Sequence, residues 1–157
     1  MVTYLYFVMV LSLAMSCGQR EAPEPDVDAR LRSTYDHFLA VMGNAGVTVK
    51  TNQLSSIEII NPSDWPQPGS VGLCYKPQDV VLKNTRFKMG EKQGKIQILD
   101  TERSDEMAVT LVHEFGHCLL DMGHSEDPGN IMYPSADFGI FLGEDEAFAG
   151  ILKNLGR

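Results

Sequence analysis

Three of the chain's four histidines lie within twelve residues, at positions 113, 117 and 124. His113 and His117 are four residues apart, so on a helix their side chains lie one above the other, with Cβ atoms about 6 Å apart. Two imidazoles at that spacing can both reach one metal ion, since a Zn–N bond is about 2 Å long. The residue types and their spacing therefore predict a metal site built on one helical turn.

Glu114 stands directly after the first of these histidines, in the sequence H-E-F-G-H. The pattern H-E-x-x-H is typical of zinc hydrolases. A carboxylate beside the metal-binding face can take a proton from a water that the metal activates, without itself binding the metal. Glu114 is therefore the predicted general base.

A catalytic zinc usually has three protein ligands and one open position, so a third ligand is needed. His124 is the candidate. On a continuous helix it would lie about 10.5 Å beyond His117 along the axis, which is too far for both to bind one ion. We therefore expect the helix to end before His124, with Gly123 in the left-handed conformation that commonly ends helices.

Residues 104–134 resemble the active site of the metzincin metallopeptidases. The resemblance rests on three short sequences, HEFGH from residue 113, GHS from residue 123 and IMYP from residue 131, and is strongest for the matrix metalloproteinase branch. It implies zinc ligands at His113, His117 and His124, with Glu114 as the catalytic base. It also implies that Met132 forms the Met-turn, the methionine that lies beneath the metal in that clan.

The spacing departs from the metzincin pattern H-E-x-x-H-x-x-G-x-x-H at one point. His124 is the seventh residue after His117 rather than the sixth, and Leu120 stands where the pattern has glycine. The turn before His124 must therefore differ from that of the clan. The local pattern H-E-x-G-H-C-x-L-x-x-x-H also resembles bacterial lipoproteins assigned as metallopeptidases, which carry the same longer spacing.

Other interpretations of these residues stay open. An H-E-x-x-H pattern can arise by chance, and a zinc ion can be structural; the second hypothesis is a non-catalytic, zinc-binding lipoprotein of the cell envelope that acts as an interaction module. A third is a gluzincin-like enzyme whose last ligand is a glutamate of a later helix, Glu144 or Glu146. Asp121 is a competing ligand four residues after His117, although a solvated helix position explains it more simply.

The N-terminal segment predicts export and lipid anchoring. Residues 1–16 carry no charged side chain and end in small residues before Cys17, as signal peptides do. Residues 14–17, Ala-Met-Ser-Cys, resemble a bacterial lipobox, although the usual leucine three residues before Cys17 is missing; a plain secretory signal or an uncleaved anchor are the alternatives. We predict a signal peptide over 1–16, a tether over 17–26 and a zinc peptidase domain over 27–157, attached to a membrane of the bacterial cell envelope.

Cysteine usage agrees with export, and the net charge restricts the kinds of partner. With Cys17 lipidated, Cys74 and Cys118 remain as an even pair in an oxidising compartment, either in a disulfide or as two buried thiols. The net charge of −8 is unchanged by removal of residues 1–16 and argues against nucleic acid, which requires a basic patch. The expected partners are a peptide or protein substrate and, through the lipid, a membrane.

The rest of the chain predicts a small α+β domain of the metzincin-like kind. Its 157 residues, 43% of them hydrophobic, suffice for one core. Helical apolar spacing predicts an N-terminal helix over 28–42, the active-site helix from Ser104 as N-cap, and a C-terminal helix over 144–155. Short runs of branched residues predict strands of a mixed sheet at 47–50, 57–60, 71–75, 80–82 and 95–99.

Overall fold

The computed structural model describes residues 24–76, 93–134 and 143–157. The predicted signal peptide, Cys17, most of the tether and the strand expected at 80–82 lie outside the described residues. The described part of the chain has an α+β architecture, which confirms the coarse fold class.

Four strands form one mixed sheet within the described residues, in the order β1-β2-β4-β3. β1 and β2 are parallel, as are β2 and β4, whereas β3 runs antiparallel to β4 and lies at the edge. The strands are β1 (Asp26–Val27), β2 (Leu54–Ile60), β3 (Gly72–Tyr75) and β4 (Gly94–Leu99).

The two central strands form the sheet side of the core. Ile57 of β2 lies opposite Ile96 of β4 in the parallel register, and these two residues and Ile98 are buried. Side chains two residues apart on a strand share a face, so Ile96 and Ile98 present one apolar surface to the helices. Gln97, between them, faces the other side and donates a hydrogen bond to Glu58 of β2.

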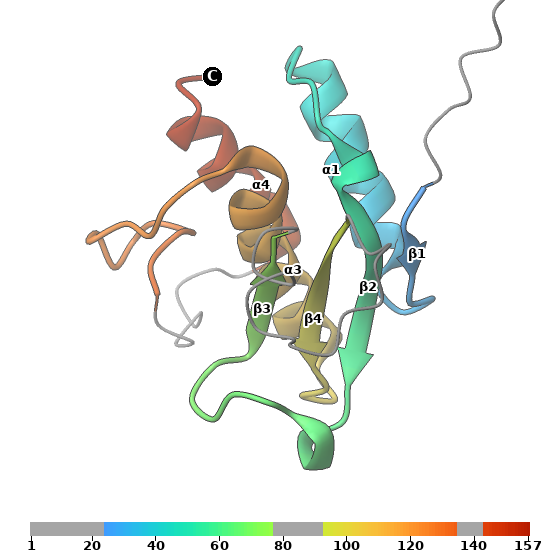
Figure 1. The fold of residues 1–157 in the computed structure, drawn as a ribbon. Helices are drawn as coiled ribbons and strands as arrows, with labels where there is room; N and C mark the ends of the chain where they lie inside the picture. The colour runs from blue at the N-terminus through green and yellow to red at the C-terminus, as the bar shows by residue number, and fades with distance from the viewer. Residues whose placement is uncertain (1–23, 77–92, 135–142) are drawn as a thin grey trace, which may run out of the picture.

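Helices form a layer on one face of this sheet (Figure 1). α3 packs against β3 and β4, while α1 and α4 pack against α3 and against each other. The three α-helices of the described residues are α1 (Arg32–Asn44), α3 (Ser104–Leu120) and α4 (Glu144–Asn154), and two short 3-10 helices cover Thr51–Gln53 and Pro62–Asp64.

α3 is the central helix of the layer and is buried on nearly all sides. Each residue from Met107 to Gly116 is buried, because the sheet covers one side of the helix and α1 and α4 cover others. The ring of Phe115 stacks on Phe38 of α1 with centroids 4.4 Å apart. The apolar spacing in the sequence predicts burial of one face only, whereas this helix is buried on nearly all sides. The core therefore fixes the position of α3.

Two local predictions are wrong. Residues 47–50 form no strand, since apolar side chains alone do not supply the backbone partner that a strand needs. Ser104 is the first residue of α3 rather than its N-cap; Arg103 occupies the cap position, and no side chain caps the helix there. Asp105 and Glu106 nevertheless lie in the first turn, where the helix dipole favours negative charge.

In the part of the chain that the structure describes, no helix combines the length and apolar character needed to cross a membrane.

Candidate metal centre

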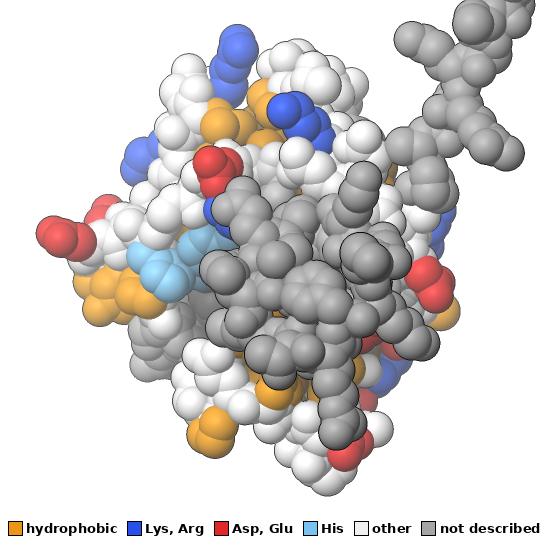
Figure 2. Space-filling model, in the orientation of Figure 1, with side chains coloured by type: hydrophobic (Ala, Val, Ile, Leu, Met, Phe, Trp, Pro, Cys, Tyr) orange, Lys and Arg blue, Asp and Glu red, His pale blue; other side chains and the backbone are white. Residues whose placement is uncertain are grey.

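The structure brings together the three histidines that the sequence predicts as ligands. Among the described residues, His113, His117 and His124 form a cluster whose potential ligand atoms all lie within 4.8 Å of one another. Histidine side chains reach the surface on the side where the loop after α3 lies (Figure 2). The cluster can therefore hold one metal ion between a buried helix and the solvent.

Backbone carbonyls orient the two helical histidines. His113 Nδ1 lies 2.6 Å from the carbonyl oxygen of Ile131, and His117 Nδ1 lies 2.8 Å from that of Met122. A carbonyl oxygen only accepts, so each Nδ1 must carry the proton and donate it. Each neutral ring then has its lone pair on Nε2, which is the arrangement typical of metal-binding histidines.

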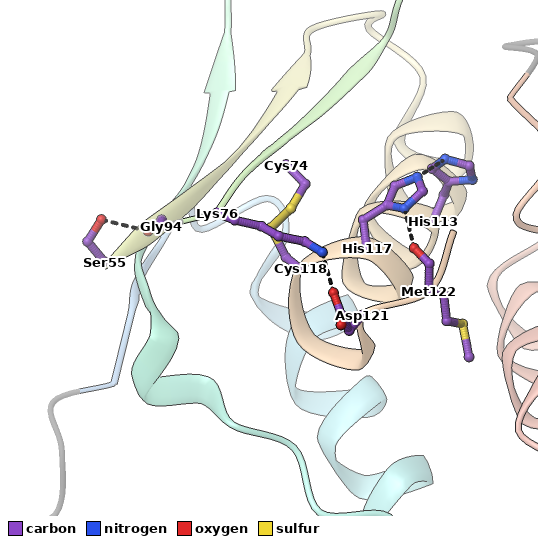
Figure 3. The surroundings of a disulfide bond; sticks show 9 residues. All are labelled: Ser55, Cys74, Lys76, Gly94, His113, His117, Cys118, Asp121 and Met122. Carbon is purple, nitrogen blue, oxygen red and sulfur yellow. Dashed lines mark hydrogen bonds and ion pairs between the residues drawn. A yellow bond between two sulfur atoms is a disulfide. The ribbon is translucent and has the colours of Figure 1, made fainter. Parts of the chain in front are cut away.

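These two Nε2 atoms face each other at 3.0 Å (Figure 3). Burial lowers the pKa of His113 to about 4 and also lowers the pKa of His117, so both rings are neutral at pH 7. Two lone pairs at that distance repel one another unless a cation lies between them. Ligand nitrogens around one tetrahedral metal ion such as zinc are roughly 3.3 Å apart, given Zn–N bonds of about 2.0–2.1 Å, so this pair of nitrogens is close enough to share one metal ion.

α3 ends before the third histidine, as expected, but a different residue ends it. Asp121 adopts the left-handed conformation, with φ of 56°, whereas Gly123 is not among the residues with positive φ. After this turn the Met122 N–H donates to the Gly116 carbonyl at 2.8 Å. Met122 thus closes the helix with its N–H and orients His117 with its carbonyl.

The exposed His124 is held through its neighbour in the loop over residues 121–134. The Ser125 N–H donates to the carbonyl of Met132 at 2.9 Å, which joins the two ends of the loop beside the cluster. The ring centroid of His124 lies 4.6 Å from that of His117 and 5.6 Å from that of His113. The loop therefore directs the third imidazole toward the two on the helix.

Glu114 lies in the wall of a cleft of about 420 Å³ that His113, His117 and His124 also line. Its side chain is 5% exposed, and burial raises the pKa of its carboxyl to about 8. A Cβ atom on Gly72 of β3 would meet Glu114 Oε1 at 2.5 Å. Glycine at position 72 therefore lets the edge strand approach the carboxylate.

Met132 lies against the helix that carries the histidines. It is 2% exposed, and a Cβ on Gly116 would meet its Sδ at 2.4 Å. Gly116, inside the H-E-x-x-H segment, is thus required for this close contact. The role of Met132 as a Met-turn, which the metzincin resemblance implies, stays a prediction.

A disulfide and an ion pair join β3 to the end of α3. Cys74 is bonded to Cys118, and the Lys76 ammonium contacts the carboxylate of Asp121 (Figure 3). Of the two states expected for the cysteines, the structure has the disulfide. The hydrogen bond from Lys76 lowers the pKa of Asp121, and this side chain is 89% exposed, which agrees with a solvated residue rather than a ligand.

The other residues considered as ligands lie outside the cluster, which contains neither Glu144 nor Glu146. The Glu144 carboxylate instead accepts a hydrogen bond from Thr34 at 3.1 Å and lies 2.9 Å from His37 Nδ1. His37 also contacts the ring of Phe148 edge-on. This group joins α1 to α4, so the fourth histidine has a structural position.

Several residues of the centre were not found by sequence analysis. The carbonyls of Ile131 and Met122 carry no side-chain signature, and Gly72 stands alone in an apolar run. Lys76 and Thr110 line the cleft but belong to no recognisable motif. They come together only through the packing of β3 on α3, where Cys74 and Cys118 are 44 residues apart in sequence.

No family model, curated protein or solved structure matches this chain.

Proposed function

We propose that this chain is a zinc-dependent peptidase of the metzincin-like kind, with His113, His117 and His124 as the metal ligands. The observation that carries the proposal is the arrangement of three imidazoles around one point, two of them oriented by backbone carbonyls, beside a buried carboxylate in a cleft. Three nitrogen ligands leave one position open, as in catalytic zinc sites and unlike closed structural ones.

When bound by these three histidines, zinc would lower the pKa of a water toward neutrality and polarise a carbonyl group. The chain's own contribution is proton transfer at the Glu114 carboxylate. Glu114 accepts the proton of the attacking water and passes it to the leaving amine. The positive charge of a bound metal favours the ionised carboxylate, which opposes the effect of burial on its pKa.

A peptide substrate fits the edge strand. Residues 71–74 line the cleft, and β3 pairs with β4 on its other side. An extended peptide could therefore add to β3 through backbone hydrogen bonds, which is a common mode of peptide recognition. This arrangement would bring a peptide bond past the three histidines.

The test is cleavage of a mixed peptide library by the zinc-loaded chain and by its Glu114→Gln variant, with zinc measured in both. Glutamine preserves the shape of the side chain but cannot accept the proton. We expect one zinc per chain in both proteins, cleavage by the wild type and a loss of at least a thousandfold in the variant, the upper part of the range for general-base catalysis. A wild type that binds zinc and cuts nothing would favour the non-catalytic interaction module.

Lipid attachment at Cys17 is a second, separate proposal, and it rests on the lipobox-like sequence before that residue. It is tested by incorporation of labelled fatty acid in a bacterial host. Label in the wild type that is absent from Cys17→Ser supports an anchor in the cell envelope. Equal absence of label in both would favour a plain secretory signal.

A further inference from the structure

The last residue of α4 holds the loop beneath the metal centre. Asn154 and Asn130 form two reciprocal hydrogen bonds through their side-chain amides: Asn130 Nδ2 donates to Asn154 Oδ1 at 2.8 Å, and Asn154 Nδ2 donates to Asn130 Oδ1 at 2.9 Å. A carboxamide offers both a donor and an acceptor, so this double contact requires an amide on each side. The C-terminal end of α4 is thereby tied to the 121–134 loop.

Asn130 also shapes the backbone that follows it. Its Oδ1 accepts the N–H of Met132 at 2.9 Å, and its carbonyl accepts the N–H of Tyr133 at 2.9 Å. A side-chain oxygen that binds the N–H two residues later fixes a local turn. Ile131 lies inside that turn, so the direction of its carbonyl depends on the Asn130 side chain.

The Ile131 carbonyl is the group that His113 Nδ1 contacts, at 2.6 Å. Ile131 is fully buried, and its Cγ2 lies so close to α4 that a Cβ on Gly150 would be 3.1 Å from it. The segment is therefore held against α4 at two points, the side chain of Ile131 and the amide pair. Of these two, the amide pair acts on the backbone turn itself.

We propose that Asn154 is a positioning residue for the metal centre: through Asn130 and the Ile131 carbonyl it sets the tautomer and orientation of His113. This inference rests on the proposed function only in taking His113 as a metal ligand. Asn154 itself is exposed and bonds to Asn130, not to a ligand. Its effect must therefore appear in the properties of His113.

The structure also provides a matched control. Asn44 is an exposed asparagine at the last position of α1, as Asn154 is at the last position of α4. The variants to compare in the full chain are Asn154→Ala, Asn130→Ala, both together, and Asn44→Ala. Urea unfolding of each variant separates a local effect from a loss of fold.

The first measurement is the ¹⁵N chemical shifts of the His113 ring in the metal-free protein at pH 7.5, which report which nitrogen carries the proton. We expect the Nδ1–H form in wild type and Asn44→Ala, and a mixture of tautomers in Asn154→Ala. Zinc affinity, measured by competition with a chelating dye, should fall about threefold to tenfold in Asn154→Ala. This is less than the 10–100-fold typical of a group that directly contacts a ligand.

The double variant decides whether the two asparagines act as one unit. If Asn154 acts through Asn130, the double variant should lose no more affinity than Asn130→Ala alone. Unchanged His113 shifts in Asn154→Ala would overturn the inference, as would additive losses in the double variant. The His113 ring shifts are measured without metal. A wild type that binds no zinc would therefore refute the proposed function, while the ring shifts would still test this inference.

Discussion

The helical half of the candidate metal centre (His113, Glu114 and His117) and its loop half (His124) are built in different ways. His113 and His117 project from α3, a helix buried on nearly all sides, and backbone carbonyls orient both rings. His124 is exposed and belongs to a segment without regular structure, which hydrogen bonds hold at its ends. The core fixes the first half, whereas the second is held by hydrogen bonds within the loop and by contacts of residues 130–132 with α3 and α4.

This difference implies a division of roles. In the proposed mechanism a buried helix supplies two ligands and the base, in positions that the fold determines. The loop would supply the third ligand at the edge of the cleft. Ordering a loop costs conformational entropy. The free energy gained when a metal binds His124 is therefore partly offset by the cost of ordering the loop.

Removal of a ligand should give the largest contrast between the two halves. Structural zinc sites bind with about 10–16 kcal/mol in total, so one ligand corresponds to roughly 3–4 kcal/mol. We expect His113→Ala to weaken zinc binding about a thousandfold and His124→Ala by about tenfold to a hundredfold, measured by chelator competition. Equal losses in the two variants would remove the distinction between helix and loop.

A buried carboxylate should destabilise the metal-free helical half at high pH. Burial raises the pKa of Glu114 to about 8, so between its unfolded value near 4.5 and pH 8 the folded state binds a proton that the unfolded state has lost. Stability therefore falls as the pH rises through this window. Glu114→Gln should stabilise the metal-free protein by a few kcal/mol at pH 8 and by little at pH 4.5, measured by urea unfolding.

The matched control is Glu126→Gln, which removes an exposed carboxylate from the loop half. It should leave unfolding unchanged at both pH values. A Glu114→Gln variant that behaves like Glu126→Gln at pH 8 would show that the carboxylate is not desolvated.

Two glycines test how tightly each half is packed. A Cβ at Gly116 would meet Met132 Sδ at 2.4 Å, whereas nothing lies within 4 Å of a Cβ at Gly123. Gly116→Ala should cost about 1–3 kcal/mol in unfolding, as expected for overpacking, and should displace Met132. Gly123→Ala should be close to neutral, and a large loss there would mean that the loop needs glycine after all.

The smallest effect is expected at the junction of the two halves. Asp121 pairs with Lys76 at the surface, and exposed ion pairs contribute little. Asparagine adopts the left-handed backbone at least as readily as aspartate. Asp121→Asn should therefore change zinc affinity by less than about twofold in the same competition assay. A larger loss would show that the Lys76 contact holds the turn before His124.

The sequence predicts the helical half of the centre better than the loop half. His113, Glu114 and His117 follow from helical spacing, which is a local rule. The need for a break before His124 follows from helix length, but the residue that ends the helix does not. Asp121 rather than Gly123 takes the left-handed turn, next to a contact with Lys76 that lies 45 residues away in sequence.

Similar reasons account for the errors in the fold. The strands of the central sheet are predicted correctly where branched residues alternate and a neighbouring strand is available for pairing, as at Ile96 and Ile98 of β4. Residues 47–50 have a comparable composition but pair with no strand among the described residues. The amide pair of Asn130 and Asn154 could not be predicted, because it joins residues 24 positions apart through side chains that are common in loops.

The most direct test of the centre is zinc X-ray absorption on the metal-loaded chain, because it counts ligands by type. We expect three imidazole nitrogens at about 2.0–2.1 Å and one oxygen ligand from water, with one imidazole lost in His124→Ala. A site with sulfur ligands or four protein ligands would be a structural zinc site. A chain that takes up no zinc would contradict the proposal that the three histidines form a zinc site.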